Sequence, residues 1–444
     1  MKKKILLLVI LVIILLAGGV AYAYYATDLF KTDKEMFFSY LTDEKLETNL
    51  NSEKLLEYYE KQANTPYESK GEISFNTSEY GESNEAKIIF NGKTVNPQKA
   101  FEQEVTLDLS QGYNIPINVK RDGDTFGIQA DILGESKYIA IRNENLKELA
   151  ERFGLDSEYI PEKIEYNTFT EEELNQLASK YYAFFNEKLT DDMFSKEKVD
   201  KQTVIKLNLS AEQFTNILTE LLNTINEDEI LNSKLPETYK ETLKNATQEL
   251  EEDLKSETYS SEDNFEMRIY IEKRKAKKLE VKFLEGTNES VNMIAEFAEN
   301  AISLKCYVEG EMVLEETISM QTNENDVTYL INCKEYEGTD EEVAEINMEL
   351  TYKNLMELDN VEEDFNIDVI QKNATTYSSD YYYEDYDGYL EDTTMNIHYS
   401  NQKTFSQDLA LDAIDENNAI IINDTTDEEL QNLIYNIYES LGLI

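Results

Sequence analysis

The sequence predicts an α+β fold, in which an N-terminal transmembrane helix precedes a curved antiparallel sheet, an open half-barrel or meander, covered by amphipathic helices. Three observations predict this class. The chain opens with an uncharged apolar stretch, alternating apolar and polar residues recur in two separate regions, and the region between them repeats apolar residues at helical spacing. Because 444 residues are more than one core usually organises, we expect an anchor and one large or two medium domains.

The first element is a candidate membrane span. Residues 5–26 carry no charge and, as a helix, would cover the roughly 30 Å core of a bilayer. Three lysines precede this stretch and Asp28 follows it, which predicts a cytoplasmic N-terminus and an extracytoplasmic remainder. We therefore expect a single-pass protein of the cell membrane that contacts the lipid bilayer through residues 5–26. A cleaved signal peptide is the competing interpretation, because Ala21-Tyr22-Ala23 fits a cleavage site.

Behind the anchor, the pattern predicts two short helices and then a meander of strands. The helices, at 33–40 and 52–62, form a linker. Alternation from Gly71, a hairpin signal at Asp122-Gly123 and a short helix that ends at Gly154 then predict an antiparallel sheet. The expected organisation is a cytoplasmic tip with signal-anchor, a helical linker and an extracytoplasmic α+β region, at residues 1–27, 28–66 and 67–444, with a subdivision into 67–260 and 261–444 as an alternative.

The central region predicts helices that cover the sheet. Thr170 and Ser210 each begin a capping box ahead of a strongly amphipathic helix. A strand at 203–209 lies between these helices, and Pro236 begins a third one. Amphipathic helices next to strands indicate a helical layer packed on the sheet.

Beyond residue 260 the pattern becomes that of a second meander. Short segments of alternating apolar residues are separated by turn sequences, which is typical of antiparallel sheet. A last amphipathic helix begins with a capping box at Thr426 and ends at Gly442. The expected strands cover 265–271, 279–283, 291–297, 302–308, 312–319, 327–333, 343–352 and 365–369.

Charge and composition exclude several classes of function. Acidic residues outnumber basic ones by 91 to 41, giving a net charge of −50, and such a field repels nucleic-acid phosphates. One histidine and two cysteines remove most metal-site and catalytic-triad chemistry. Nucleophile-elbow, phosphate-loop and dinucleotide motifs are missing from the sequence. We therefore expect no nucleic-acid partner, no metal or cofactor and no enzymatic activity.

The two cysteines are predicted to be free thiols in the core. Turn sequences at 309–310 and 323–326 place one strand between the strands of Cys306 and Cys333, so that Cys306 pairs near Val313 and Cys333 pairs near Glu316. Two strand spacings amount to about 9.6 Å, which exceeds the roughly 7 Å between Cα atoms that a disulfide can bridge. A disulfide is the alternative, because both cysteines lie outside the cell in the predicted topology.

A hypothetical apolar pocket comes from the helix after Ser210. If the curved sheet stands away from this helix, its apolar face lines a pocket for an acyl chain or another apolar ligand. If the helix packs directly on the sheet, the same face only adds core stability. The residues concerned are Phe214, Ile217, Leu218, Leu221 and Leu222.

A hypothetical surface site comes from the acidic, tyrosine-rich tract at 378–392. Tyrosine combines apolar area with a polar tip, which suits recognition. An exposed hairpin and a weak calcium site are the alternative interpretations. The tyrosines proposed for recognition are Tyr381, Tyr382, Tyr383 and Tyr386.

The one basic run, at 273–278, falls on a predicted turn between two strands. We interpret it as a solvated turn, because the surrounding field is negative. Contact with anionic lipid or with a wall polymer is the alternative interpretation.

Two stretches of the sequence resemble known groups of proteins. The stretch Tyr138–Gly154, with Phe37–Leu41 behind the anchor, resembles uncharacterised membrane-anchored proteins of low-GC Gram-positive bacteria, a group that carries over no activity or functional residue. Residues 203–225, a strand running into an amphipathic helix, are similar to part of the open half-barrel of bacterial lipoprotein and lipid carriers. The sequence favours a membrane-anchored, extracytoplasmic binding or envelope-associated protein without catalytic activity, partnered by an envelope component. A carrier of lipid or another apolar ligand, held between sheet and helices, is the alternative.

Overall fold

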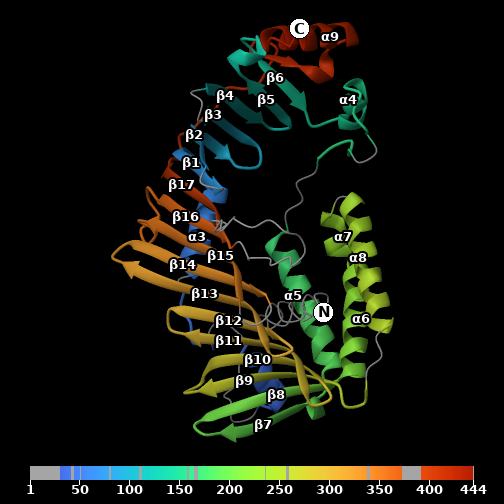
Figure 1. Ribbon diagram of the computed structural model, residues 1–444. Coiled ribbons are helices and arrows are strands. Elements are labelled where there is room, and N and C mark those ends of the chain that lie inside the picture. Colours follow the sequence, from blue (N-terminus) through green and yellow to red (C-terminus); the bar gives the residue numbers. More distant parts are fainter. Residues whose placement is uncertain are drawn as a thin grey trace, which may run out of the picture. The chain divides into compact units, whose positions relative to one another are not determined.

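The computed structural model confirms an α+β protein built on antiparallel strands, with eight α-helices in the part of the chain that it describes (Figure 1). Of the helices within that part, none is both long and apolar enough to span a bilayer. The candidate span at 5–26 lies outside the described residues. The described residues are 31–41, 45–50, 52–79, 82–109, 113–157, 160–164, 169–235, 237–256, 260–337, 341–372 and 392–443.

The chain divides into two compact units, and neither is continuous in sequence. The division crosses strands β13 (Glu311–Asn323), β14 (Asp326–Glu337) and β15 (Glu341–Lys353). Unit 1 consists of Met1–Leu50, Asn167–Ser319 and Cys333–Glu342. Unit 2 consists of Asn51–Tyr166, Met320–Asn332 and Val343–Ile444.

The strands of unit 1 form an antiparallel meander in which each strand pairs with the next one along the chain. The two faces differ in polarity. On β9, Phe265 and Met267 are fully buried on one face, whereas Glu266 and Arg268 lie on the other. The strands are β7 (Phe194–Val199), β8 (Gln202–Ser210), β9 (Asn264–Glu272), β10 (Lys275–Glu285), β11 (Asn288–Ala298), β12 (Ala301–Val308) and the first part of β13.

Helices cover the apolar face of this meander, and in Figure 1 the longer ones lie along one side of the strands. Both predicted capping boxes are confirmed, at Thr170 and at Ser210. Phe185 and Leu218 of these helices pack with Phe265 of β9 in one continuous apolar core. The helices of unit 1 are α2 (Asp33–Ser39), α5 (Glu171–Lys188), α6 (Ala211–Asn226), α7 (Glu229–Lys234) and α8 (Glu237–Ser256).

In unit 2, strands from the N-terminal and C-terminal parts of its sequence pair with each other. β15 and β16 pair with each other, β16 pairs with β17, and β17 pairs with β1, from which a meander runs to β6. The bounds are β15 (Glu341–Lys353), β16 (Glu362–Gln371), β17 (Thr393–Phe405), β1 (Tyr67–Glu79), β2 (Glu82–Asn96), β3 (Ala100–Leu109), β4 (Tyr113–Asp122), β5 (Thr125–Gln129) and β6 (Tyr138–Arg142).

The C-terminal segment of unit 2 adds a parallel strand and a helix next to β6. β18 (Ala419–Ile421) pairs in parallel with β6, with Ala419 opposite Tyr138. The short 3₁₀ turn η4 (Ile422–Asp424) leads from it into α9 (Asp427–Ser440), which begins with the predicted capping box at Thr426. The remaining helices of this unit are α3 (Ser52–Asn64) and α4 (Leu146–Arg152).

Most predicted elements are confirmed, including the turn at Gly123, which has a φ of 59°. Five elements were not predicted from the sequence: β2, β7, β17, β18 and α7. β17 pairs with a strand on each of its edges. Met395, Ile397 and Tyr399 alternate along β17, so the strand carries a short periodic signal, and backbone hydrogen bonds on two edges hold its whole length in place.

Both cysteines are free, as predicted. Cys306 is buried in the core of unit 1, where burial raises the pKa of its thiol to about 11. Cys306 pairs with Leu314, next to Val313, near which the pairing was predicted, and the register shifts between Cys306 and Tyr307.

Candidate functional site

The five residues of the hypothetical apolar pocket lie in the core of unit 1. The exposed fractions of Phe214, Leu221 and Leu222 are 5%, 1% and 5%. The ring of Phe214 stacks on that of Phe265, with 4.8 Å between centroids. Ile217 and Leu218 belong to the same cluster. A ligand on this face of α6 would therefore have to displace packed side chains.

The hypothetical surface site falls in a part of the chain that the structure does not describe. Tyr381, Tyr382, Tyr383 and Tyr386 lie outside the described residues. Within the described ranges, no group of three or more His, Cys, Asp or Glu side chains could hold a metal ion. The single histidine, His398, lies 3.0 Å from Asp364 on the neighbouring strand.

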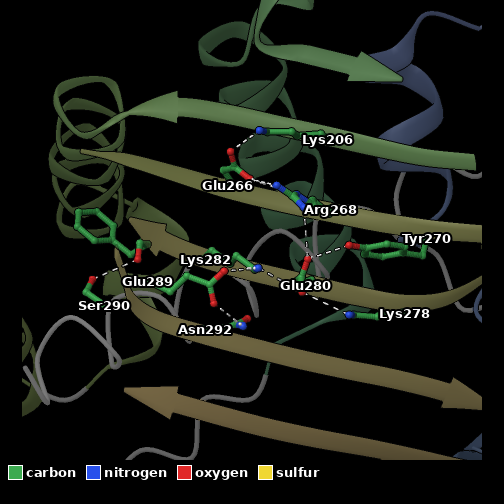
Figure 2. A network of polar contacts seen from close by, with 11 residues as sticks. Lys206, Glu266, Arg268, Tyr270, Lys278, Glu280, Lys282, Glu289, Ser290 and Asn292 are labelled. Atoms are coloured by element: carbon green, nitrogen blue, oxygen red, sulfur yellow. Dashed lines mark hydrogen bonds and ion pairs between the residues drawn. The ribbon is translucent and has the colours of Figure 1, made fainter. Parts of the chain in front are cut away.

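A network of polar side chains covers the face of the unit 1 sheet opposite its apolar core (Figure 2). Glu266 of β9 is only 6% exposed, and Lys206 and Arg268 bind its carboxylate. Burial raises the pKa of Glu266, but hydrogen bonds from Lys206 and Arg268 outweigh burial, so this pKa lies below its ordinary value. The carboxylate therefore stays ionised at neutral pH.

Glu280 of β10 is the second buried carboxylate of this network (Figure 2). Tyr270 donates a hydrogen bond of 2.8 Å to Glu280, and the ammonium groups of Lys278 and Lys282 lie 3.3 and 3.6 Å from the same carboxylate. Burial raises the pKa of Glu280, but the Tyr270 hydrogen bond and the two lysine charges lower it below its ordinary value. Since these charged groups pair with one another, we interpret the network as a structural tie between strands.

A second polar cluster, in unit 2, is buried more deeply. Glu363 of β16, Lys403 of β17 and Tyr58 of α3 have exposed fractions of 3%, 5% and 0%. Lys403 donates to both oxygens of Glu363 at 2.8 and 2.9 Å, and Tyr58 donates to Glu363 at 2.8 Å. Burial, together with the charge of Glu363, raises the pKa of Tyr58 well above its ordinary value. This cluster fastens α3 to the sheet.

The candidate site is a groove in unit 2 beside β18 and α9. Buried Leu149, Ile422 and Leu430 pack together and hold α9 against α4 and η4. The groove has a volume of about 430 Å³, which falls within the range of small-molecule sites. Its lining residues are Glu135, Glu416, Ala419, Ile420, Ile421, Asp424, Thr425, Glu429, Asn432, Leu433 and Asn436.

Four of these lining residues are acidic, and they differ in their partners. Asp424 pairs with Arg142, and Glu429 accepts the backbone N–H of Thr426 in the capping box of α9. That hydrogen bond holds the pKa of Glu429 below its ordinary value. Within the described part of the chain, the carboxylates of Glu135 and Glu416 have no hydrogen bond or ion pair. Among the described residues, two carboxylates of the groove are therefore available to a ligand.

The rest of the groove combines amides with an apolar floor. Asn432 and Asn436 are exposed and lie four residues apart, on one face of α9. Ala419 and Leu433, both buried, contribute apolar surface beneath them. Carboxylates and amide oxygens accept hydrogen bonds, and apolar surface suits a hydrocarbon stem. The groove thus has the chemistry to hold an ammonium or guanidinium group on a short aliphatic chain.

The groove was not predicted from the sequence, although the residues on one of its sides follow a regular pattern. Glu429, Asn432 and Asn436 follow helical spacing on the polar side of the predicted last helix. The other side comes from Glu135 and from the loop before β18, which only the parallel pairing of β18 with β6 brings alongside α9. The pattern of apolar and polar residues within one segment does not show with which distant strand that segment pairs.

Comparisons with known proteins give no functional assignment for this chain. No protein-family model and no curated protein matches the chain. The MucA/MucB complex of Pseudomonas aeruginosa is 8% identical, with a TM-score of 0.13, covering 79% of this chain and 93% of that chain. OccK10 of Pseudomonas aeruginosa is 8% identical (TM-score 0.14, covering 77% of this chain and 99% of that chain), and transferrin binding protein B of serogroup B Neisseria meningitidis is 6% identical (TM-score 0.11, covering 77% of each chain). Likenesses at these TM-scores carry no argument about function.

Proposed function

We propose that this chain is a membrane-anchored, extracytoplasmic binding protein without catalytic activity, and that the groove beside β18 and α9 holds a small cationic ligand. The observation that carries the proposal is a pair of carboxylates, Glu135 and Glu416, that have no partner among the described residues and lie at a groove with an apolar floor. The net charge of −50 supports it, because a negative field raises the local concentration of cations. The ligand class is an amine or guanidine, either as a small molecule or as the side chain of an envelope peptide.

The binding mode follows from the groove's own residues. An ammonium group would lie between Glu135 and Glu416, since each charge-assisted hydrogen bond contributes more than a neutral one. The side-chain oxygens of Asn432 and Asn436 would accept further hydrogen bonds from the same ligand. Its aliphatic stem would cover Leu433, which removes apolar surface from water.

Neutralising the two free carboxylates is expected to weaken binding of a polyamine probe, spermidine. Glu135→Gln with Glu416→Gln keeps the shape of both side chains and removes both charges, so the dissociation constant should rise at least about tenfold. Isothermal titration calorimetry at moderate ionic strength measures the change.

A matched control removes the same net charge elsewhere in unit 2. Glu148 and Asp412 are exposed and lie outside the groove lining. Glu148→Gln with Asp412→Asn should change spermidine affinity by less than about twofold, because salt screens exposed charges at a distance. Equal losses in the two double variants would show that spermidine follows net charge only, and would reject the groove as the site.

The proposed topology has a separate test. Lysines before residue 5 and an acidic remainder orient the candidate span with the folded units outside the cell. Protease added to intact protoplasts is expected to digest the chain beyond residue 28. Complete protection of the folded units would contradict both the orientation and the localisation.

A further inference from the structure

Two neighbouring turns at one end of the unit 1 sheet concentrate basic residues in an otherwise acidic chain. One turn joins β7 to β8 and the other joins β9 to β10. Thr203 of β8 lies opposite Ile271 of β9, so the two turns lie side by side. We call them the basic turn pair; its five basic residues, against the acidic Asp200 and Glu272, are Lys198, Lys201, Lys273, Arg274 and Lys275.

Four of these cations are available to an external partner. Lys198, Lys201, Lys273 and Arg274 are exposed and form no ion pair or hydrogen bond through their side chains within the described ranges. Elsewhere on this sheet, basic side chains are paired: Lys206 binds Glu266, for example. The basic turn pair therefore departs from the pairing that the rest of the sheet follows.

The two basic residues at the centre of the β9–β10 turn adopt a backbone conformation that is unfavourable for residues with long side chains. Lys273 and Arg274 have φ values of 50° and 64°, the left-handed conformation that both central residues of a type I′ hairpin require. Asn-Gly is the preferred sequence for this turn, because asparagine and glycine adopt positive φ most readily. Because two long cationic side chains occupy these positions despite that cost, we infer that their positive charge is functional.

The point where the chain enters the fold lies close to these turns. The candidate span ends at residue 26 and α2 begins at Asp33, and an extended linker of that length reaches about 20 Å. Asp33 pairs with Lys196 of β7 at 2.9 Å. Lys196 is four residues from Asp200, or about 13 Å along the strand. The basic turn pair is therefore within reach of the surface of the membrane that would hold the anchor.

We infer that the basic turn pair docks on anionic lipid headgroups and so orients unit 1 at the membrane. This inference rests on the proposed membrane anchor. The field of the whole chain repels an anionic surface, so a local cluster of cations, four of which have no partner among the described residues, selects which part of the unit approaches it. Each basic residue near an anionic bilayer contributes a favourable interaction that salt weakens.

The test uses the full chain incorporated into nanodiscs of phosphatidylcholine, or of an equal mixture of phosphatidylcholine and phosphatidylglycerol. A water-soluble acetylating reagent then labels lysines, and mass spectrometry gives the rate at each site. Lys201 and Lys273 are expected to react about tenfold more slowly in the anionic discs. Lys244, exposed on α8 of the same unit, is the internal control and should change little.

The decisive variant is Lys273→Asn with Arg274→Gly, which removes two charges and installs the preferred turn sequence. Its melting temperature should equal or exceed that of the wild type, so a loss of folding does not confound it. Lys201 remains as a reporter in this variant, and its protection in anionic discs should fall severalfold.

Each other outcome contradicts the inference in a distinct way. Equal slowing at Lys201 and Lys244 would mean that lipid charge acts on the whole unit without docking. Protection in neutral discs by added polyglycerol phosphate, without protection by anionic lipid, would replace the membrane with a soluble wall polymer. A chain that does not co-elute with nanodiscs contradicts the anchor, and the inference falls with it. A co-eluting chain with unprotected turns contradicts the inference alone.

Discussion

Replacing Glu363 with Ala is expected to lower the free energy of unfolding by about 3–5 kcal/mol. The ammonium group of Lys403, 5% exposed, would stay buried without the carboxylate that accepts two of its three hydrogen bonds. Tyr58 and Tyr399 would lose the same acceptor, to which they donate at 2.8 and 2.9 Å. Chemical denaturation followed by circular dichroism measures the change.

The adjacent residue provides a matched control. Glu362, on the same strand, pairs with Lys353, and the side-chain exposed fractions are 39% and 38%. Because exposed pairs contribute about 0–1 kcal/mol, Glu362→Ala should have a far smaller effect than Glu363→Ala. A double variant, Glu363→Met with Lys403→Met, should recover part of the loss, since it leaves no charge unpaired. Equal effects at 362 and 363 would show that the buried cluster does not fasten α3.

Local patterns were enough to predict the elements whose stability is local. A capping box involves residues three positions apart, and those at Thr170, Ser210 and Thr426 are all present. The hairpin predicted from Asp122-Gly123 is likewise local: Asp122 pairs with Thr125, and Gly123 and Asp124 form the two-residue loop. Such features are confirmed because nothing distant has to be known to place them.

The polar clusters could not be predicted, because they join distant parts of the chain. Tyr58 and Glu363 are 305 residues apart in sequence. Their contact requires β1 to pair with β17 and α3 to pack on that sheet, and neither step leaves a periodic signal in the segments themselves. With 91 acidic residues in the chain, no sequence argument could select Glu363 from its neighbours.

Amphipathic pattern has a different limit, which the helix α6 illustrates. An apolar face at helical spacing shows that the face is covered, but not whether protein or ligand covers it. The structure places Phe214 against Phe265 and Phe283 of the sheet, with ring centroids 4.8 and 5.9 Å apart. Contacts of this kind are those of a packed core.

Leu221→Ala is accordingly expected to lower the free energy of unfolding by about 2–5 kcal/mol, through lost burial and the cavity that remains. Leu221 is 1% exposed, among the residues of the unit 1 core. The control is Leu174→Ala on α5, where the side chain is 52% exposed, and the effect should stay within about 0.5 kcal/mol. Thermal and chemical denaturation of both variants measure the difference.

The same variants separate core packing from lipid carriage. A ligand that binds the native state raises the unfolding midpoint by mass action, so a lipid bound between α6 and the sheet would stabilise the wild type in proportion to its concentration. Direct packing predicts no such shift, and it predicts that lipid does not rescue Leu221→Ala. A midpoint that rises with added fatty acid or phospholipid in the wild type, together with a bound lipid mass by native mass spectrometry, would contradict direct packing and restore the pocket to Phe214, Ile217, Leu218, Leu221 and Leu222.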